Sequence, residues 1–319
     1  MNSVLGPRAS SILYNVLRSN KDRLKEGYVI LPANVCPIVP VTFLKADVAF
    51  KFIDIDPLSQ CLDLELLEQE IAKQADCRGV LFVHSYGSRQ NTEGIFRALR
   101  NLNPSLFLID DRCVGVPEMG TESQNPLANL NLYSTGYAKL VEFGRGGFGY
   151  LSGDTNYEVY SGLFNEADRE ALVGQMNESI QKDVAFIYKD SGWLEHEHDL
   201  VEAEYFDRIQ AQMPKSRKHK DLLNSIYADQ LPKELQMPIG LCQWRFNLQM
   251  DNKAQLLKAI FDGGLFASSH YTSVSQVFGG NEAPVAEATH RRMLNLFNDY
   301  RFTEADAMKV CGIINKTLN

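Results

Sequence analysis

The stretch Leu106-Phe-Leu-Ile-Asp-Asp111 is a short apolar run that ends in two acidic residues. Runs of this length and composition are typical of strands buried on both faces of a parallel sheet. Gly79 to His84 (GVLFVH) is a second run of this kind, and Thr92 to Leu102 between the two is predicted to form a helix. The alternation predicts an α/β domain in which helices cover both faces of a mostly parallel sheet.

The same alternation extends outward along the chain. We expect further strands at residues 28–31, 48–55, 130–134 and 147–151, and helices at 10–19, 36–44 and 64–72. Residues 157–227 are polar and helix-rich, and a strand-like stretch (241–248) and helices at 253–262, 284–297 and from Thr303 follow. We therefore expect a large domain over residues 1–205 and a small α/β C-terminal domain over residues 206–319.

Composition and charge exclude several classes of protein. The 319 residues are 45% apolar and 23% charged, and the net charge is −8 without a long basic run, which argues against nucleic acid as a partner. No apolar run reaches the roughly 18 residues that a membrane span needs, and the N-terminus does not resemble a secretory signal. The six cysteines are scattered without a CxxC pair, so we expect reduced thiols in a cytoplasmic protein and no metal site.

The segment Ser134-Thr-Gly-Tyr-Ala-Lys139, followed by Gly144-Arg-Gly-Gly147, carries the strongest chemical signal. A lysine amine can form a Schiff base with a cofactor aldehyde. The serine hydroxyl before it can reach that cofactor's phosphate, and the glycines permit close approach of the backbone. The alternative is an ordinary surface lysine followed by a glycine turn.

Two other segments fit the same kind of cofactor. Asp111 stands at the carboxyl end of a buried strand, where α/β sheets bind ligands, and a carboxylate there can keep a pyridoxal ring nitrogen protonated. Gly6-Pro-Arg-Ala-Ser-Ser11 places small and hydroxyl residues at a helix start, which is a favourable anion site. A turn or helix cap is the alternative for each.

Taken together, the three segments resemble the DegT/StrS family of pyridoxal-phosphate (PLP) enzymes, mostly nucleotide-sugar aminotransferases of fold type I. The resemblance extends to YVILPANVCPIVPVTFLKADVAFKFIDIDP (28–57), to VLFVHSYG (80–87) and to residues 283–315. It covers about residues 6–152 and 240–315 and is weak in the middle. It implies the PLP transferase fold of type I, with a large domain and a small C-terminal domain.

The resemblance also implies roles for particular residues. Lys139 takes the place of the Schiff-base lysine and Asp111 that of the aspartate at the ring nitrogen, and both are expected to be catalytic. Ser134 and Ser10 take the places of phosphate ligands, with Ala9 and Ser11 beside Ser10.

At two positions the chain departs from the family. Cys36 stands where members have an aromatic residue or histidine that stacks on the cofactor ring, and Val114 stands where they often have glutamine. We still include Cys36 among the expected cofactor contacts.

The implied activity is transfer of an amino group, expected from glutamate, to a nucleotide-linked keto-sugar in surface-polysaccharide or related amino-sugar biosynthesis. The implied assembly is a homodimer that binds a nucleotide sugar and an amino donor, with no nucleic-acid or membrane partner. A PLP-dependent sugar dehydratase is a second reading, although such relatives have histidine in place of the lysine. A PLP-binding regulatory or catalytically altered protein is a third, because of Cys36, Val114 and the short middle region.

Two charged stretches stand outside the resemblance. The segments EHEHD (195–199) and KSRKHK (215–220) are predicted to be solvated, the second at the start of a helix. His84 is predicted to be a packed side chain near the site. Arg145, in the glycine turn, is a candidate contact to substrate or phosphate.

Overall fold

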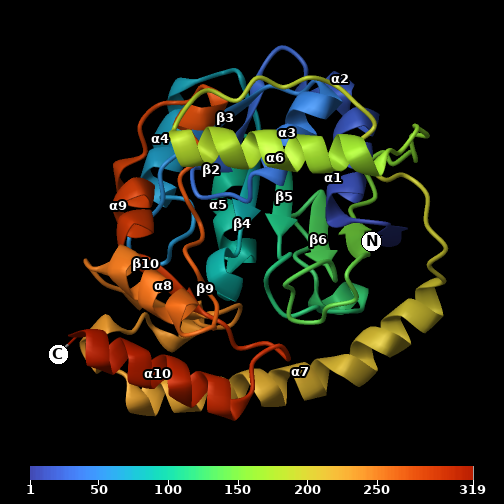
Figure 1. Cartoon of the computed structure of the whole chain (residues 1–319). Coiled ribbons are helices and arrows are strands. Elements are labelled where there is room, and N and C mark those ends of the chain that lie inside the picture. The colour runs from blue at the N-terminus through green and yellow to red at the C-terminus, as the bar shows by residue number, and fades with distance from the viewer. Residues whose placement is uncertain (319) are drawn as a thin grey trace.

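A seven-stranded sheet forms the centre of the computed structural model, which describes residues 1–318 (Figure 1). The strands are β1 (Asn2–Gly6), β2 (Tyr28–Pro32), β3 (Phe50–Ile53), β4 (Cys77–Val83), β5 (Phe107–Asp111), β6 (Leu130–Ser134) and β7 (Gly147–Leu151), in the order β1-β7-β6-β5-β4-β2-β3. Neighbours from β6 to β3 are parallel, and β7 and β1 add antiparallel strands at one edge. The predicted α/β class with a mostly parallel sheet is confirmed. Residue 319, the last of the predicted small domain, lies outside the described residues.

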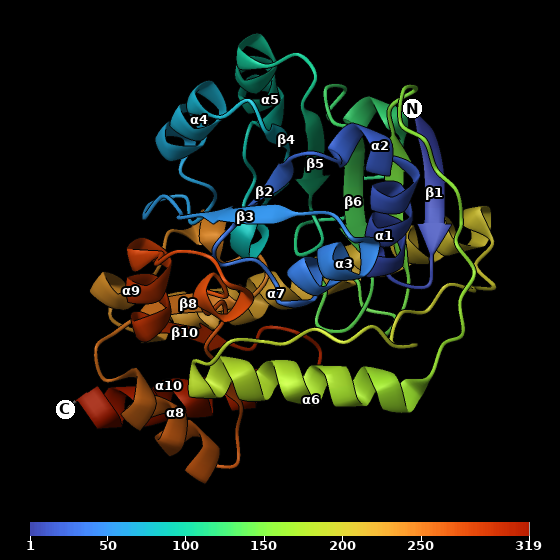
Figure 2. The ribbon, with the colours of Figure 1, turned by 90° about the horizontal axis from the view of Figure 1, so that it is seen from above.

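Helices cover both faces of this sheet (Figure 2). On one side lie α1 (Ala9–Ser19), α2 (Lys21–Leu24) and α3 (Ile38–Ala46), and on the other lie α4 (Leu64–Lys73) and α5 (Thr92–Leu102). Neighbouring residues of β4 divide between the two layers, because Leu81 packs into the core around α1 and Phe82 into the core around α4 and α5. This burial on both faces explains why the central run of β4 is apolar without alternation.

An additional helix, α6 (Glu166–Lys182), lies outside α1 and α3 (Figure 2). It buries Leu172 and Met176 against Trp193 and Leu194 of the following segment and against Val41 of α3. This outer layer belongs to the middle of the chain, where the sequence resemblance is weak.

A second core lies in the C-terminal part, below the central sheet in Figure 1. It contains a three-stranded antiparallel sheet in the order β8-β10-β9, and it is covered by helices. The elements are α7 (Glu202–Gln230), β8 (Phe246–Gln249), α8 (Lys253–Asp262), β9 (Ala267–Ser268), α9 (Pro284–Arg292), β10 (Met293–Leu296) and α10 (Glu304–Leu318). The boundary that we predict after residue 205 falls inside α7. We call residues 206–318 the C-terminal region.

Two expectations for local structure are corrected, and one strand had no prediction. The helix predicted over 284–297 ends at Arg292, and the next four residues form β10 between β8 and β9. Strand β1 was not predicted from the sequence. The KSRKHK segment lies in the middle of α7 rather than at a helix start, and its Lys220 is buried instead of solvated.

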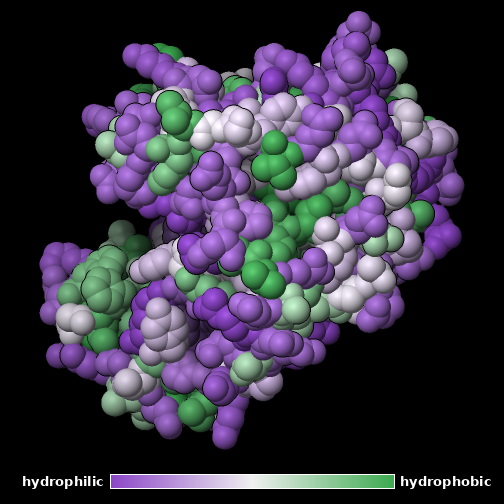
Figure 3. Space-filling model, turned by 90° about the vertical axis from the view of Figure 1, so that its right-hand side faces the viewer, coloured by the Kyte–Doolittle hydropathy of each residue, from purple (hydrophilic) through white to green (hydrophobic). Residues whose placement is uncertain are grey.

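The surface is mostly hydrophilic, with local hydrophobic areas. On the face at the right of Figure 1, hydrophobic residues gather around a hollow and hydrophilic residues surround them (Figure 3). Within residues 1–318, no helix is both long and apolar enough to cross a membrane.

Candidate active site

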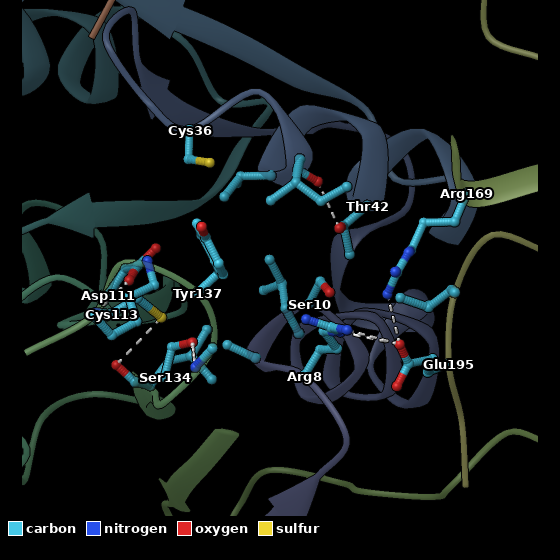
Figure 4. Close-up of a pocket in the computed structure, with 18 of the residues that line it drawn as sticks. Arg8, Ser10, Cys36, Thr42, Asp111, Cys113, Ser134, Tyr137, Arg169 and Glu195 are labelled. Atoms are coloured by element: carbon cyan, nitrogen blue, oxygen red, sulfur yellow. Dashed lines mark hydrogen bonds and ion pairs between the residues drawn. The ribbon is translucent and has the colours of Figure 1, made fainter. Parts of the chain in front are cut away.

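A cavity of about 500 Å³ lies beside the carboxyl ends of β5 and β6 and the start of α1. Six of the seven residues expected to bind a cofactor line it: Ala9, Ser10, Cys36, Asp111, Ser134 and Lys139. In Figure 4, Asp111, Cys113 and Ser134 lie toward one end, Arg169 and Glu195 toward the other, and Ser10 and Arg8 between them. The fold therefore brings together three segments that are far apart in the sequence.

The glycine turn between β6 and β7 lies directly against the start of α1. A Cβ atom at Gly147 would lie 2.6 Å from the backbone nitrogen of Ala9, so no larger residue fits there without a shift. Gly146 has a φ of +94°, and its N–H donates to the carbonyl of Pro7 at 2.6 Å. These glycines are required because the helix start and the lysine turn share one edge of the cavity.

The first turn of α1 faces the cavity with donors. Arg8 precedes the helix in an extended conformation and provides no side-chain cap, so no side chain blocks the N-terminal end of α1, which favours an anion. Ser10 is half-buried and lines the cavity. Ser11 does not line it, because its buried hydroxyl donates to the carbonyl of Glu195 at 2.6 Å.

Asp111 presents a buried carboxylate to the cavity. Its side chain accepts the N–H of Cys113 at 2.9 Å, and among residues 1–318 it has no ion-pair partner. Burial raises the pKa of Asp111, against the opposing effects of the Cys113 N–H and of Lys139. A carboxylate of this kind is well suited to a cationic ligand group.

Asp110 lies in a closed network away from this cavity. It accepts hydrogen bonds from His84 Nε2 at 2.7 Å, Thr92 Oγ1 at 2.8 Å and Arg112 Nε at 3.0 Å. His84 is buried and does not line the cavity, as expected of a packed side chain. These bonds lower the pKa of Asp110 despite its burial, with His84 contributing most.

Two thiols lie beside the amine of Lys139. Cys36 is exposed and lines the cavity, and desolvation by the surrounding protein raises the pKa of its thiol although Lys139 opposes the shift. Cys113 also lines the cavity, and burial together with the charge of Asp111 raises its pKa further. Both thiols therefore stay protonated and act as small apolar groups.

A charged cluster that sequence reasoning missed closes the other end of the cavity. Glu195 Oε1 accepts from Arg8 Nε at 3.1 Å and from Arg169 NH1 at 2.9 Å. Glu195 is one-fifth exposed, and the neighbouring His196 is buried against Tyr14. The expectation that residues 195–199 are all solvated is therefore wrong for these two. No sequence signal indicated this pairing, because Arg8 and Glu195 are 187 positions apart.

Arg145, in contrast, points away from the cavity. Its guanidinium pairs with Asp199 at 2.8 Å on the surface, and it is not one of the lining residues. Tyr137, which was not singled out from the sequence, also lines the cavity (Figure 4).

Comparison with solved structures identifies the architecture. A DegT/DnrJ/EryC1/StrS aminotransferase from Brucella abortus matches 99% of this chain and 86% of its own, with a TM-score of 0.71 and 16% identity. This chain has the fold of these aminotransferases. DesV from S. venezuelae, solved in complex with a ketimine intermediate, has a TM-score of 0.70 and 15% identity, and the match covers 99% of this chain and 84% of DesV.

DesI, solved in the presence of its TDP-sugar product, gives a TM-score of 0.73 at 14% identity, with 99% of this chain and 80% of DesI covered. No protein-family model and no curated protein matches the sequence. The similarity is therefore seen in the folded structures, and the sequence identities are too low for a match by sequence alone.

The DegT/StrS-type fold implies PLP, and the cavity fits that group. The buried carboxylate of Asp111, which lacks a cationic partner within residues 1–318, suits a protonated ring nitrogen. The uncapped start of α1, with Ser10 and with Ser134 nearby, suits a phosphate. The amine of Lys139 lines the same cavity, within reach of the same ligand.

Proposed function

We propose that the chain is a PLP-dependent aminotransferase that transfers an amino group from glutamate to a nucleotide-linked keto-sugar. The observation that carries the proposal is the convergence of Lys139, Asp111, Ser134 and the start of α1 on one cavity. The fold shared with DesI, which was solved with its TDP-sugar product, supports a nucleotide sugar as the acceptor. The biosynthesis of surface polysaccharides or related amino sugars is the corresponding context.

Each residue of the cavity has a stated task in this proposal. When bound, PLP withdraws electrons from the α-carbon of an amine that is joined to it. Asp111 holds a proton at the ring nitrogen, and Ser10 and Ser134 donate hydrogen bonds to the phosphate. Lys139 Nζ takes the proton from the substrate α-carbon and returns it, since it is a half-buried amine on the same cavity wall.

The attachment of the cofactor to Lys139 is tested by borohydride reduction and peptide mapping. The pyridoxyl mass should appear on the peptide that contains Lys139. A label on Lys45 or Lys51 instead would refute the assignment. The Lys139→Ala variant, which should carry no label, is the control.

A PLP-binding protein without catalysis is the second candidate, favoured by Cys36 and Val114. Val114 is buried in an apolar cluster with Tyr86 and Trp244, so its position offers no polar contact to a cofactor. Incubation with glutamate alone separates the two candidates. An aminotransferase converts bound PLP to its amine form and releases 2-oxoglutarate, whereas a regulatory protein leaves the cofactor absorbance unchanged.

We also propose a homodimer. Support comes from large apolar side chains on the surface around the middle segment, where Leu163 is 93% exposed and Ile187 is 75% exposed. Light scattering after size-exclusion chromatography should give twice the mass of the chain. Leu163→Glu should shift the mass toward that of one chain.

The proposed location is the cytoplasm. The six cysteines are free thiols, and four of them, Cys61, Cys77, Cys242 and Cys311, are buried in hydrophobic cores where oxidation would disrupt packing. Fractionation of cells that express the tagged protein would test this placement.

A further inference from the structure

The residue before Lys139 has an unusual backbone conformation. Ala138 has a φ of +56°, in the left-handed region that non-glycine residues seldom adopt. Its N–H donates to Glu142 Oε2 at 2.9 Å, and its carbonyl accepts from Trp244 Nε1 at 2.7 Å. That carbonyl belongs to the peptide bond that joins Ala138 to Lys139. Side chains therefore hold both polar groups of the residue that orients the lysine.

Glu142 is in turn fixed by Arg301. Arg301 NH1 donates to Glu142 Oε2 at 3.0 Å and NH2 donates to Oε1, which is a bidentate pair. The Glu142 side chain is only 8% exposed, so water competes weakly for it. The hydrogen bonds to Glu142 raise the pKa of Arg301, and its guanidinium also lies over the ring of Tyr137 at 4.7 Å.

Trp244 is equally well anchored. Its backbone N–H donates to the Tyr86 carbonyl at 3.0 Å, and its carbonyl accepts from Lys220 Nζ at 2.8 Å. Its ring stacks on Tyr271 with centroids 5.3 Å apart. The indole N–H is thus aimed at Ala138 by contacts on several sides.

Both anchors come from the C-terminal region. Trp244 is 106 positions from Ala138, and Arg301 is 159 positions from Glu142. They lie next to β8 and between β10 and α10, outside the central sheet that carries the lysine turn. The contacts of Trp244 and Arg301 with this turn therefore require that the C-terminal region is packed against it.

We propose that Trp244, Glu142 and Arg301 are positioning residues that aim Lys139 at the cavity. Loss of either anchor frees Ala138 to leave the left-handed region, which turns the following residue. The contacts around Ala138 are seen in this chain without a cofactor. Their effect on catalysis rests on the proposed function. The proposal thus couples packing of the C-terminal region to the orientation of the reactive amine.

The first test uses the protein without cofactor. Hydrogen exchange of a peptide that spans residues 136–143 should rise about tenfold or more at the Ala138 amide in Arg301→Gln, because a charge-assisted pair no longer holds Glu142. Arg292→Gln, which removes an exposed ion pair with Asp251 in the same region, is the matched control and should leave this exchange unchanged. Unfolding midpoints confirm that each variant is folded. Exchange in Arg301→Gln equal to wild type would overturn the proposal.

The second test asks whether the Lys139 side chain loses its orientation toward the cavity. Trp244→Phe keeps an aromatic side chain but removes the indole N–H together with its five-membered ring, so we expect covalent attachment of PLP to Lys139 to slow about tenfold. Trapping with borohydride at timed intervals measures this rate, and the KM for glutamate should change less than kcat. Unchanged attachment in Trp244→Phe and Arg301→Gln would refute the positioning role even if exchange had risen.

The two proposals fail in different ways. If wild type never attaches PLP to Lys139, the proposed function fails, while hydrogen exchange still decides whether the turn is held as described. If wild type attaches PLP normally and the anchor variants match it in exchange and in rate, the positioning proposal fails and the function stands.

Discussion

The carboxylates of Asp110 and Asp111 lie on opposite faces of the central sheet. The residues are consecutive at the end of β5, so strand alternation turns their side chains apart. Asp111 lines the cavity, whereas Asp110 is enclosed by His84, Thr92 and Arg112. Burial raises the pKa of Asp111, and the hydrogen bonds lower that of Asp110. Two identical side chains thus have opposite electrostatic environments.

Exchange of each aspartate for asparagine should therefore have different effects. Asp111→Asn should keep PLP yet lose transamination by about two decades or more, because an amide cannot hold the ring proton. Asp110→Asn should mainly lower stability, by about 3 kcal/mol, because it breaks a buried charge network. Turnover and urea unfolding measure the two effects. A crippled but fully stable Asp110→Asn would show that the register at this site is wrong by one residue.

The phosphate of the cofactor should depend on neutral donors rather than on Arg8. Ser10→Ala combined with Ser134→Ala should weaken PLP binding by about two to four decades, if the contributions add. Arg8→Ala should weaken PLP binding less, since the Arg8 guanidinium is already bonded to Glu195 and to the carbonyl of Gly144 at 3.1 Å. Titration of the apoprotein with PLP compares the variants. A larger loss in Arg8→Ala than in the double serine variant would contradict this assignment.

Glu195 should limit the binding of anions at its end of the cavity. Glu195→Gln leaves Arg8 and Arg169 without their shared carboxylate, so affinity for inorganic pyrophosphate should rise about fivefold, equivalent to roughly 1 kcal/mol. The gain should shrink as salt is added. Glu197→Gln, an exposed change in the same segment, is the matched control. Equal affinities in both variants would show that Glu195 does not compete with anions.

Lys220 should make stability depend on pH above neutrality. Burial, with repulsion from Arg245, lowers its pKa to about 7, whereas a lysine in an unfolded chain titrates near about 10.4. Between these values the unfolded state binds one more proton, so the stability contributed by Lys220 rises with pH. Below pH 7 both states are protonated and the slope vanishes.

The measurement is the difference in unfolding free energy between wild type and Lys220→Met at several pH values. The free energy of unfolding of wild type should increase relative to that of Lys220→Met as the pH rises from 7 to 10. Lys218→Met, an exposed change two residues earlier in α7, should show no such trend. A pH-independent difference for Lys220→Met would mean that this amine is charged throughout.

The sequence predicts most of the central sheet because several of its strands have a recognisable apolar pattern of their own. The central stretches of β4 and β5 are apolar without alternation, and burial on both faces requires this. Strand β1, which reads NSVLG, has no such pattern and is a strand because it pairs with β7. Met293–Leu296 continues a helix-compatible sequence, yet pairing with β8 and β9 makes it β10.

The residues of the candidate site likewise fall into a group that the sequence predicts and a group that it does not. The place of Lys139, Asp111 and Ser134 at one cavity could be predicted, because Asp111 and Ser134 end recognisable strands and Lys139 follows the second of them closely. Arg169 and Glu195 could not, because they come from the middle segment, where neither a motif nor a resemblance indicates what they contact. Their role emerges only when α6 and the segment after it fold back over α1 and α3.

The pairing of β1 with β7 has a consequence for the order in which the protein can fold during synthesis. Gly6 meets Gly147, so the ribosome must make about 140 further residues before the first strand finds its place. Until then, the apolar face of α1, with Ile12 and Leu13, has no completed sheet to cover. Contacts between segments so distant form slowly and leave apolar surface open meanwhile. The newly made chain should therefore depend on chaperones most strongly before β7 leaves the exit tunnel.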